Sequence, residues 1–333
     1  MNTALPLAAA SGEALGTTAI KLQVRAIRLL AEGIHSFELT DPDGGELPAF
    51  EAGSHLDVHL PGGLVRSYSL AGDPADRARW TLGVLRETNG RGGSRAMHDR
   101  VRVGDVLSVG APRNAFPLAP GGSHTVLIAG GIGITPLKAM AHELSAQGAS
   151  FEIHYCARSP RQAAFIDELR TLVPKDRLHF HFDNGVPGQG LDIAGLLKNQ
   201  PDGAHLYYCG PGGFMKACAE ASAHWTDGSV HSEHFAAPER MAPIASGDGF
   251  EVRLARTGAT LRVESDQTIV RAMEIAGHRV PTSCLSGLCG SCKVDYLEGD
   301  VEHNDYILTD EEKTRCLTLC VSRSRGPRLV LDI

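Results

Sequence analysis

The sequence predicts a multidomain protein of mixed α/β and β structure, in which an antiparallel β-barrel precedes a parallel α/β domain and a cysteine-bearing C-terminal domain. Three observations lead to this fold class. Short alternating apolar runs fill residues 19–121, strand and helix patterns alternate through residues 122–236, and a compact cysteine group lies in residues 250–333. At 333 residues, the chain is long enough for two or three domains that each bury a core.

Composition and charge narrow the classes of partner. Hydrophobic residues make up 42% of the chain and charged residues 21%, which is ordinary for a globular protein. The net charge of −7 and the lack of a basic stripe argue against nucleic acid, and no apolar stretch is long enough to span a membrane. Residues 1–18 lack the basic start and long apolar core of a signal peptide, so we expect them to form a disordered tail.

The first region, residues 19–121, consists of short apolar runs separated by turn residues such as Pro61-Gly-Gly63. Short strands at this spacing are typical of an antiparallel barrel or sandwich. The expected strands are residues 20–30, 36–39, 55–60, 64–70, 80–85 and 106–109.

Two clusters in this region carry polar chemistry. The run Arg66-Ser-Tyr-Ser-Leu70 places a cation and an aromatic ring on one strand face and two hydroxyls on the other. Further along, Arg91-Gly-Gly-Ser-Arg95 leads into a short helix expected at residues 96–100. Glycines followed by a hydroxyl at a helix start form a nest of N–H groups that suits phosphate. Taken alone, Tyr68 fits a half-buried strand aromatic and the glycine loop fits a simple hairpin.

From residue 122 onward, the pattern changes to alternating strands and helices. This alternation predicts a parallel sheet with helices packed against it. The expected strands are residues 125–129, 151–155, 178–182, 205–209 and 229–235, and the expected helices are residues 137–147, 162–172, 191–197 and 212–223.

Two glycine loops follow strands of this expected sheet. The loop from Gly130 to Pro136 departs from the usual dinucleotide fingerprint, because Pro136 replaces the third glycine and no acid ends the next strand. It still delivers glycines to a helix N-terminus, where free N–H groups can bind a pyrophosphate. The run Cys209-Gly-Pro-Gly-Gly213 does the same at the end of a later strand, on the edge where open α/β sheets bind ligands.

The most specific pattern in the chain is the cysteine group of the C-terminal region. Three cysteines lie at C-x₄-C-x₂-C spacing, and a fourth follows further on. Thiolates with this spacing hold a plant-type [2Fe–2S] cluster, whereas structural zinc prefers two C-x₂₋₄-C pairs. The expected ligands are Cys284, Cys289, Cys292 and Cys320.

Two glycines and a competing cysteine bear on this assignment. We expect Gly287 and Gly290 to adopt positive φ, so that the loop turns and its N–H groups approach sulfur. On count alone, Cys316 competes with Cys320 as the fourth ligand. The scattered cysteines outside the cluster fit free thiols in a reducing cytoplasm.

The motifs of the three regions together resemble known families. Arg-x-Tyr-Ser with a Gly-Ser loop is similar to the flavin site of the ferredoxin–NADP⁺ reductase superfamily, and Gly-Gly-x-Gly-x-Thr-Pro with Cys-Gly-Pro is similar to its pyridine-nucleotide domain. The Leu-x-Cys-x-Ser-Arg context of Cys320 resembles the end of plant-type ferredoxin domains, which favours Cys320 over Cys316. With a flavin barrel first, a nucleotide domain second and a ferredoxin domain last, the chain resembles the phthalate dioxygenase reductase family. Close relatives of this family include the reductases of vanillate O-demethylase.

This resemblance implies an FMN-binding barrel at residues 19–121, an NAD-binding α/β domain at 122–236, a linker at 237–249 and a β-grasp [2Fe–2S] ferredoxin domain at 250–333. It also implies the residues around each cofactor. Those for FMN are Arg66, Tyr68, Ser69, Gly83, Val84, Leu85, Gly92, Gly93, Ser94 and Phe235, with Arg91 or Arg95 adding charge. Those for NAD are Gly131, Gly133, Thr135, Pro136, Arg158, Ser159, Asp183, Cys209, Gly210 and Pro211.

The implied function is the reductase component of a two-component Rieske-type aromatic oxygenase or O-demethylase. Electrons pass from NADH, with NADPH as the alternative, through FMN and the [2Fe–2S] cluster to the terminal oxygenase. No side chain need act as an acid or base, and Phe235 and Cys209 line the flavin and nicotinamide stack, although Phe235 also fits a core position. We expect a cytoplasmic monomer that binds neither nucleic acid nor membrane.

Other functions stay open at this point. An NAD(P)H-dependent flavin reductase with a diffusible acceptor would need no cluster, and a non-catalytic module could hold zinc at the cysteines. A hydroxylase reductase of another class would usually place the ferredoxin domain first. The acidic residues crowded into 295–312 fit either a solvated face or a docking surface for a basic partner.

Overall fold

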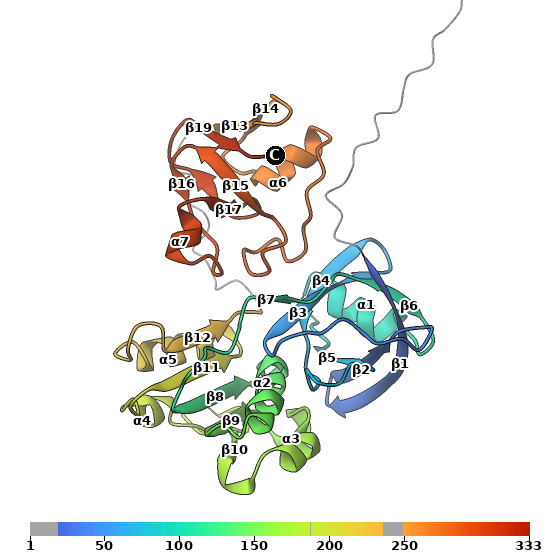
Figure 1. Cartoon of the computed structure of the whole chain (residues 1–333), viewed down its shortest axis with the longest axis vertical. Helices are drawn as coiled ribbons and strands as arrows, with labels where there is room; N and C mark the ends of the chain where they lie inside the picture. Colours follow the sequence, from blue (N-terminus) through green and yellow to red (C-terminus); the bar gives the residue numbers. More distant parts are fainter. Residues whose placement is uncertain (1–18, 89, 187, 236–248) are drawn as a thin grey trace, which may run out of the picture.

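The computed structural model of this chain describes residues 19–88, 90–186, 188–235 and 249–333. The tail expected at 1–18, and the linker expected at 237–249 apart from Gly249, lie outside the described residues. The strands gather into three main sheets, and the C-terminal unit lies above the other two, which are side by side (Figure 1). Within the described ranges, no helix combines the length and the apolar character that crossing a membrane requires.

The first sheet is antiparallel and closes on itself. Its strands run in the order β4-β3-β6-β1-β2-β5, β7 pairs with β3, and a bridge between Leu70 and Leu82 joins the outer strands. Alternate residues point inward, so Phe37 and Trp80 are fully buried. The elements are β1 (Ile20–Ala31), β2 (Ile34–Thr40), β3 (Ser54–Leu60), β4 (Leu64–Ser69), β5 (Trp80–Leu85), α1 (Gly93–Arg100), β6 (Val106–Val109) and β7 (Arg113–Asn114).

The second sheet is parallel, with the strand order β10-β9-β8-β11-β12. Helices α2 and α3 contribute to the core on one face, and α4 and α5 to the core on the other. The elements are β8 (His124–Gly130), η1 (Gly131–Gly133), α2 (Ile134–Ala146), β9 (Phe151–Ala157), η2 (Pro160–Gln162), α3 (Ile166–Leu172), η3 (Lys175–Arg177), β10 (Leu178–Phe182), α4 (Ile193–Leu197), β11 (Ala204–Cys209), α5 (Gly212–Ala221) and β12 (Val230–Glu233).

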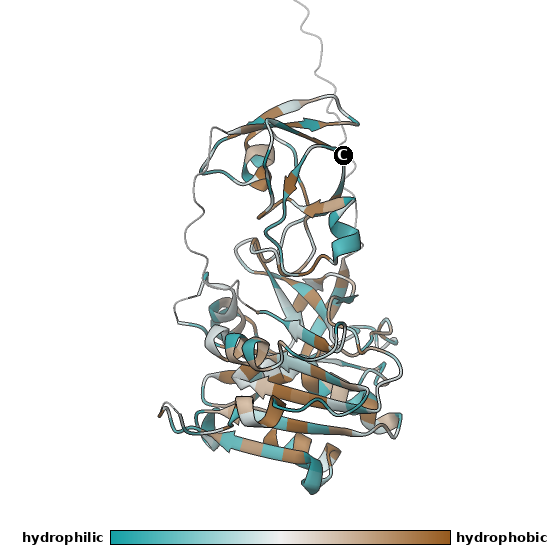
Figure 2. Ribbon diagram, turned by 90° about the vertical axis from the view of Figure 1, so that its left-hand side faces the viewer, coloured by the Kyte–Doolittle hydropathy of each residue, from teal (hydrophilic) through white to brown (hydrophobic). Residues whose placement is uncertain are grey.

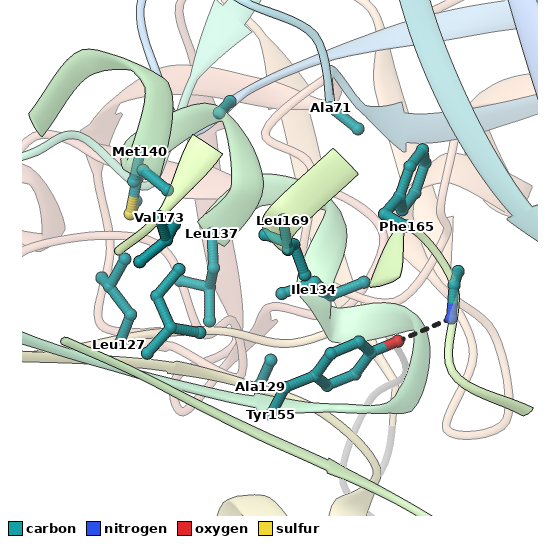
Figure 3. Packing of buried hydrophobic residues seen from close by; sticks show 14 of the residues in the cluster. Ala71, Leu127, Ala129, Ile134, Leu137, Met140, Tyr155, Phe165, Leu169 and Val173 are labelled. Carbon is teal, nitrogen blue, oxygen red and sulfur yellow. Dashed lines mark hydrogen bonds between the residues drawn. The ribbon is translucent and has the colours of Figure 1, made fainter. Parts of the chain in front are cut away.

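Figure 3 shows how the first two domains share one apolar core. Leu137 of α2 packs with Leu127 of β8, and the same cluster reaches Ala71, which follows the barrel strand β4. The hydroxyl of the buried Tyr155 accepts a hydrogen bond from the Ala164 N–H at 2.9 Å, so its polar end is satisfied. Each fully buried leucine stabilises such a core by about 1.5–3 kcal/mol. The continuous core therefore fixes the barrel against the parallel sheet.

The third unit is a mixed sheet with the strand order β14-β13-β19-β15-β17, in which β13 and β19 are parallel. Helix α6 packs its buried side chains on this sheet, which gives a β-grasp arrangement. The short α7 begins with a capping box at Thr309 and is hydrophilic, as its teal colour in Figure 2 shows. The elements are β13 (Phe250–Leu254), β14 (Thr260–Val263), α6 (Ile269–Ile275), β15 (Lys293–Glu298), β16 (Val301–Glu302), α7 (Asp310–Lys313), β17 (Cys316–Thr318), β18 (Arg323–Ser324) and β19 (Arg328–Leu331).

The observed elements differ from the expected ones at a few ends. The helix expected at 162–172 begins only at Ile166, because Phe165 has a φ of 62° and cannot continue a helix. The helix expected at 137–147 starts three residues earlier, at Ile134, and Pro136 lies in its first turn. The last strand of the second domain ends at Glu233, before Phe235.

Candidate cofactor sites and the contact between them

Arg66 extends from β4 across the start of α1. Its Nη1 donates to the Val65 carbonyl at 2.7 Å and its Nη2 to the Arg91 carbonyl at 2.8 Å. Burial, and then the neighbouring Arg91, lower the pKa of Arg66, and no carboxylate of the described residues offsets this charge. Two guanidinium groups beside the free N–H groups of a helix start suit a phosphate.

The glycine loop that precedes α1 is shaped by this arginine. Gly92 has a φ of 84°, a conformation that glycine adopts without strain. A Cβ on Gly93 would overlap the side chain of Arg66, so the arginine can lie flat only over a glycine. Ser94 accepts a hydrogen bond from the Glu87 N–H at 3.0 Å, and its own hydroxyl proton remains available. The expected phosphate residues thus form one cradle with Arg66.

Tyr68 lies next to this cradle, and its hydroxyl group lacks a hydrogen-bond partner among the described residues. Its ring packs against the barrel core, and its hydroxyl is buried without a hydrogen-bond partner in the described part of the chain. Burial raises the pKa of Tyr68, so the phenol stays protonated. The buried Tyr68 hydroxyl can donate a hydrogen bond to the polar edge of a planar ring. The cationic cradle beside it suits a phosphate attached to that ring. The residues present therefore fit FMN.

Ser69 and Glu233 join the barrel to the end of the parallel sheet. Ser69 Oγ donates to Glu233 Oε2 at 3.2 Å, and His55 Nδ1 lies 4.0 Å from Glu233 Oε1. The Glu233 side chain is 13% exposed, and burial raises its pKa to about 8. Burial also lowers the pKa of His55 to about 4, so both groups are mainly neutral at pH 7. A neutral carboxyl here can donate a hydrogen bond as well as accept one.

The remaining expected flavin residues, in β5, lie in two environments. Gly83 lies where the barrel meets the second domain, and a Cβ there would approach Thr135 Cγ2 to 2.8 Å. The Val84 side chain is buried in the barrel core, and Leu85 packs against the core of the second domain. The structure therefore offers a ligand the backbone of this segment, not the side chains of Val84 and Leu85.

The two glycine loops of the second domain press against each other. A Cβ on Gly133 would overlap the Cys209 carbonyl, and Gly131 has a φ of 54°. Thr135 and Pro136 are buried in the first turn of α2. Burial raises the pKa of Cys209 well above its usual range, which keeps this thiol protonated and unreactive. The second loop continues after Cys209 with Gly210 and Pro211.

Residues expected on the adenosine side lie just past neighbouring strand ends. Arg158 and Ser159 follow β9 and Asp183 follows β10, and the Asn184 N–H donates to the Arg158 carbonyl at 2.8 Å. Arg158 is exposed, whereas Asp183 Oδ1 accepts from the Gly185 N–H at 2.8 Å. A cation and a carboxylate therefore share the edge where open sheets bind nucleotides.

The four expected cluster cysteines converge. The Leu288 N–H donates to Cys284 Sγ at 3.3 Å. Cys284 also interacts with Cys289 and Cys320, which lowers the pKa of Cys284, and Cys320 interacts with Cys292. Four soft sulfur donors with N–H groups directed at them fit a [2Fe–2S] cluster.

Cys316 is turned away from this group. Its thiol donates to the Glu312 carbonyl at 3.1 Å, and its charged neighbours are those of β15 and α7. The expected loop geometry is confirmed, since Gly287 and Gly290 have φ values of 72° and 70°. A Cβ on Gly287 would lie 2.8 Å from Val321 Cγ2, so the loop is also tightly packed.

The cluster loop rests on the barrel through a polar network centred on Asp57, which no sequence motif had indicated. Ser67 Oγ donates to Asp57 Oδ1 at 2.7 Å and lies 3.0 Å from Ser283 Oγ. Arg113 Nη2 donates to Asp57 Oδ2 at 2.7 Å and to Ser291 Oγ at 3.1 Å. Burial alone would raise the pKa of Asp57, but Arg113 and the serine hydroxyls hold it below its usual range. We call these residues the Asp57 network: Asp57, Ser67, Arg113, Ser283 and Ser291.

Two further contacts bring the sites together. Arg91 Nη2 donates to the Cys284 carbonyl at 2.5 Å, which ties the phosphate cradle to the first cluster cysteine. The rings of His234 and Tyr306 lie 5.6 Å apart, at the end of the second domain and in the third. Phe235 is 43% exposed, so it is not a core residue, and it follows Glu233 closely enough to reach the same region.

Comparison with known proteins agrees with this arrangement. The family model of the 2Fe-2S iron-sulfur cluster binding domain matches residues 252–325. The reductase subunit of tert-butanol monooxygenase / tert-amyl alcohol desaturase from Aquincola tertiaricarbonis is 50% identical over 95% of this chain and 96% of its own. Vanillate O-demethylase oxidoreductase from Pseudomonas sp. strain HR199 is 46% identical over 94% of this chain and 100% of its own.

A solved structure covers the same three units. Phthalate dioxygenase reductase from Burkholderia cepacia is 40% identical over 94% of this chain and 97% of its own. The solved structure of a phthalate dioxygenase reductase, described as modular for electron transfer from pyridine nucleotides to [2Fe-2S], superposes with a TM-score of 0.72. That match covers 95% of this chain and 98% of the solved one at 40% identity.

Proposed function

The chain belongs to the family of phthalate dioxygenase reductase and vanillate O-demethylase oxidoreductase, and we infer from this membership that it is the reductase component of a Rieske-type oxygenase or O-demethylase. It is an NAD(P)H-dependent iron–sulfur flavoprotein oxidoreductase that passes electrons to an oxygenase partner. When bound, FMN converts a two-electron hydride into single electrons, and the [2Fe–2S] cluster carries these onward. The protein's part is to hold these groups close together in the right orientation.

In this proposal, the cradle of Gly92, Gly93 and Ser94 holds the FMN phosphate. Arg66 and Arg91 neutralise its charge, since no carboxylate of the described residues competes for Arg66. The Tyr68 hydroxyl donates to a polar edge of the flavin, which gives the buried phenol the partner it needs. Phe235, which is exposed, covers the ring until the nicotinamide takes its place.

The second domain orients the nicotinamide nucleotide. The N–H groups around Gly131 and Gly133 receive the pyrophosphate, and the buried Cys209 forms an inert wall beside the nicotinamide. Asp183 disfavours a 2′-phosphate by charge repulsion, so we propose a preference for NADH. The ratio of kcat/KM for NADH to that for NADPH measures this preference. A ratio below one would contradict the role given to Asp183.

Cys284, Cys289, Cys292 and Cys320 are the proposed cluster ligands. The Asp57 network then acts as the docking interface that holds the cluster loop against the barrel. Because Asp57 bonds to side chains from the barrel and from the cluster loop, it orients both sides at once. Arg113 pairs with the carboxylate at 2.7 Å, so the charge of Asp57 is not left uncompensated in this buried position.

One observation supports this function most strongly, namely that Arg91 of the phosphate cradle donates directly to the Cys284 carbonyl. A flavin reductase with a diffusible acceptor does not require this contact. It also does not require the iron–sulfur domain that the family model matches at residues 252–325. A zinc module would not need a flavin cradle beside its cysteines. We further propose that the protein works as a monomer in the cytoplasm.

The test is a complete assay with purified components. Anaerobically purified protein should contain about one FMN, two iron and two acid-labile sulfide per chain. With NADH, it should drive substrate turnover by its oxygenase partner, at a rate that depends on the cluster. Activity toward free quinones or flavins that persists unchanged after cluster removal, with no oxygenase turnover, would favour the diffusible-acceptor reductase instead.

A further inference from the structure

A histidine group lies on the second sheet, away from the nucleotide loops. Glu152 and His154 are on β9, His179 is on β10, and His124 begins β8. His154 and His179 are register partners in the parallel pair, and Glu152 shares their face because strand side chains alternate. This face is opposite the one that α2 covers. The group lies toward the amino ends of the strands, whereas the nucleotide loops follow the carboxyl ends.

The donor atoms of this group have the spacing of ligands around one ion. Glu152 Oε2 lies 3.6 Å from His154 Nε2 and 3.7 Å from His179 Nε2. All three atoms lie within 4.8 Å of one another, and His124 Nε2 is 3.7 Å from Glu152 Oε1. The distances from the Glu152 oxygens are longer than ordinary hydrogen bonds. They are close to the edge of a tetrahedron around a cation with bonds of about 2.0–2.1 Å, which is about 3.4 Å.

A hydrogen bond on the other side of the ring holds His154 in place. His154 Nδ1 lies 3.0 Å from His181 Nε2, and either nitrogen can be the donor. When His154 Nδ1 carries the proton, His154 Nε2 presents its lone pair to the Glu152 carboxylate. Second-shell hydrogen bonds of this kind orient histidines that bind metals.

The Nε2 atom of His154 is buried and lacks a hydrogen-bond partner in the described part of the chain, which is unusual for a polar atom. The side chain is 9% exposed, and Nε2 has no hydrogen-bond partner within the described residues. The His179 ring stacks on it at a centroid distance of 4.8 Å, which holds both imidazoles in place. A buried imidazole nitrogen without a hydrogen-bond partner, next to a carboxylate and a second imidazole, is satisfied when a cation lies among the three.

We propose that Glu152, His154 and His179 bind one divalent metal ion of the zinc class, with His124 as the nearest further ligand. Two imidazoles and a carboxylate are a common donor set for Zn²⁺, and imidazole also suits Cu²⁺ and Ni²⁺. The bound ion links β9 to β10 and, through His124, to β8. Its expected effect is therefore on the stability of the second domain rather than on electron transfer.

The test is calorimetric titration of the tag-free holoprotein with ZnCl₂, with thermal unfolding measured with and without the metal. The wild-type protein should bind about one Zn²⁺ per chain and unfold at a higher temperature when zinc is present. His154→Ala should weaken this binding by at least about tenfold. His231→Ala is the matched control, because His231 pairs with His205 at 3.0 Å in the same domain without a carboxylate, and it should bind zinc like the wild type.

Because His154→Ala changes a buried residue and could prevent folding, the test includes variants at two less buried ligands. Glu152→Gln and His179→Ala remove one ligand each, and both should lower zinc affinity to a similar degree while the flavin content stays unchanged. Iron should also remain bound throughout, which excludes zinc exchange at the cluster cysteines. Equal zinc affinity in the wild type and in both variants, or loss of iron in step with zinc uptake, would overturn the proposal.

Discussion

Arg91 donates a hydrogen bond from Nη2 to the carbonyl oxygen of Cys284 across 2.5 Å. These two residues belong to different domains, one to the loop that precedes α1 and the other to the loop of the cluster cysteines. The backbone carbonyl of the same Arg91 holds Arg66, which lies across Gly93. One residue thus connects the proposed phosphate cradle to the proposed cluster, which places the two cofactors as neighbours.

Removing this contact should slow electron transfer between the cofactors. Arg91→Ala keeps the carbonyl that holds Arg66 but loses the bond to Cys284, so the cluster loop spends less time docked. In protein saturated with FMN, we expect the step from flavin to cluster to slow roughly three- to tenfold, with little change in hydride transfer. Rapid-mixing absorbance measures both steps. Arg100→Ala, at the exposed end of α1, is the control, and an equal effect there would contradict a specific role for Arg91.

The fourth cluster ligand can be identified by substitution. Cys320→Ser should abolish most of the visible absorption of the cluster, because Cys320 interacts with Cys284 and Cys292. Cys316→Ser should retain it, because the Cys316 thiol donates to the Glu312 carbonyl instead. Iron content per chain and the visible spectrum check both variants. If Cys316→Ser loses the cluster while Cys320→Ser keeps it, the assignment is reversed.

Glu233 should give stability a distinctive dependence on pH. Its pKa is raised by burial to about 8, above that of an unfolded glutamate near 4.3, so between these values the folded state holds a proton that the unfolded state has lost. Stability from this residue is therefore present at low pH and declines as pH rises toward 8, by on the order of 1 kcal/mol per pH unit.

Glu233→Gln removes this titration while keeping the size of the side chain. Relative to the wild type, the variant should gain thermal stability as pH rises from 5 to 8. Unfolding temperatures at both pH values measure the effect. The exposed Glu220→Gln serves as the control and should show no such trend. A constant difference between Glu233→Gln and the wild type across this range would mean that Glu233 is already ionised in the fold.

Gly93 should be indispensable for flavin retention. In Gly93→Ala, the new methyl group overlaps Arg66, and the overpacking displaces the arginine at a cost of about 1–3 kcal/mol. We expect FMN to bind roughly tenfold more weakly, as measured by fluorescence titration of the deflavinated protein. Gly45→Ala provides the comparison, since its new methyl group meets only ordinary contacts at 3.5 Å or more. Unchanged FMN affinity in Gly93→Ala would argue against the cradle.

Local patterns in the sequence predicted the fold well where a short segment alone determines the conformation, as in an alternating apolar strand or a glycine turn. The strand expected at Trp80–Leu85 has these bounds, because its alternating apolar residues must face the barrel core. Gly287 and Gly290 adopt positive φ as expected, because the cysteine loop must turn there. The helix expected at 162–172 was wrong in its first part, because the left-handed Phe165 gives no signal in composition.

The parts of the site that depend on distant residues were not predictable from spacing. The Asp57 network joins β3, β4 and β7 to the cysteine loop, and the two-residue strand β7, which carries Arg113, is too short to show a period. Glu233 lies in a segment noted only as the end of a domain, and its high pKa follows from burial that only the fold creates. The same holds for His154 and His179, which become neighbours only when β9 and β10 pair in parallel.

The most direct test of the account is rapid mixing of the anaerobic holoprotein with NADH while the absorbance of flavin and of cluster is followed separately. The flavin signal should fall first, the cluster signal should follow, and protein stripped of FMN should show no cluster reduction. Reduction of the cluster before the flavin, or at an unchanged rate in protein without FMN, would contradict electron transfer from NADH through flavin to the cluster.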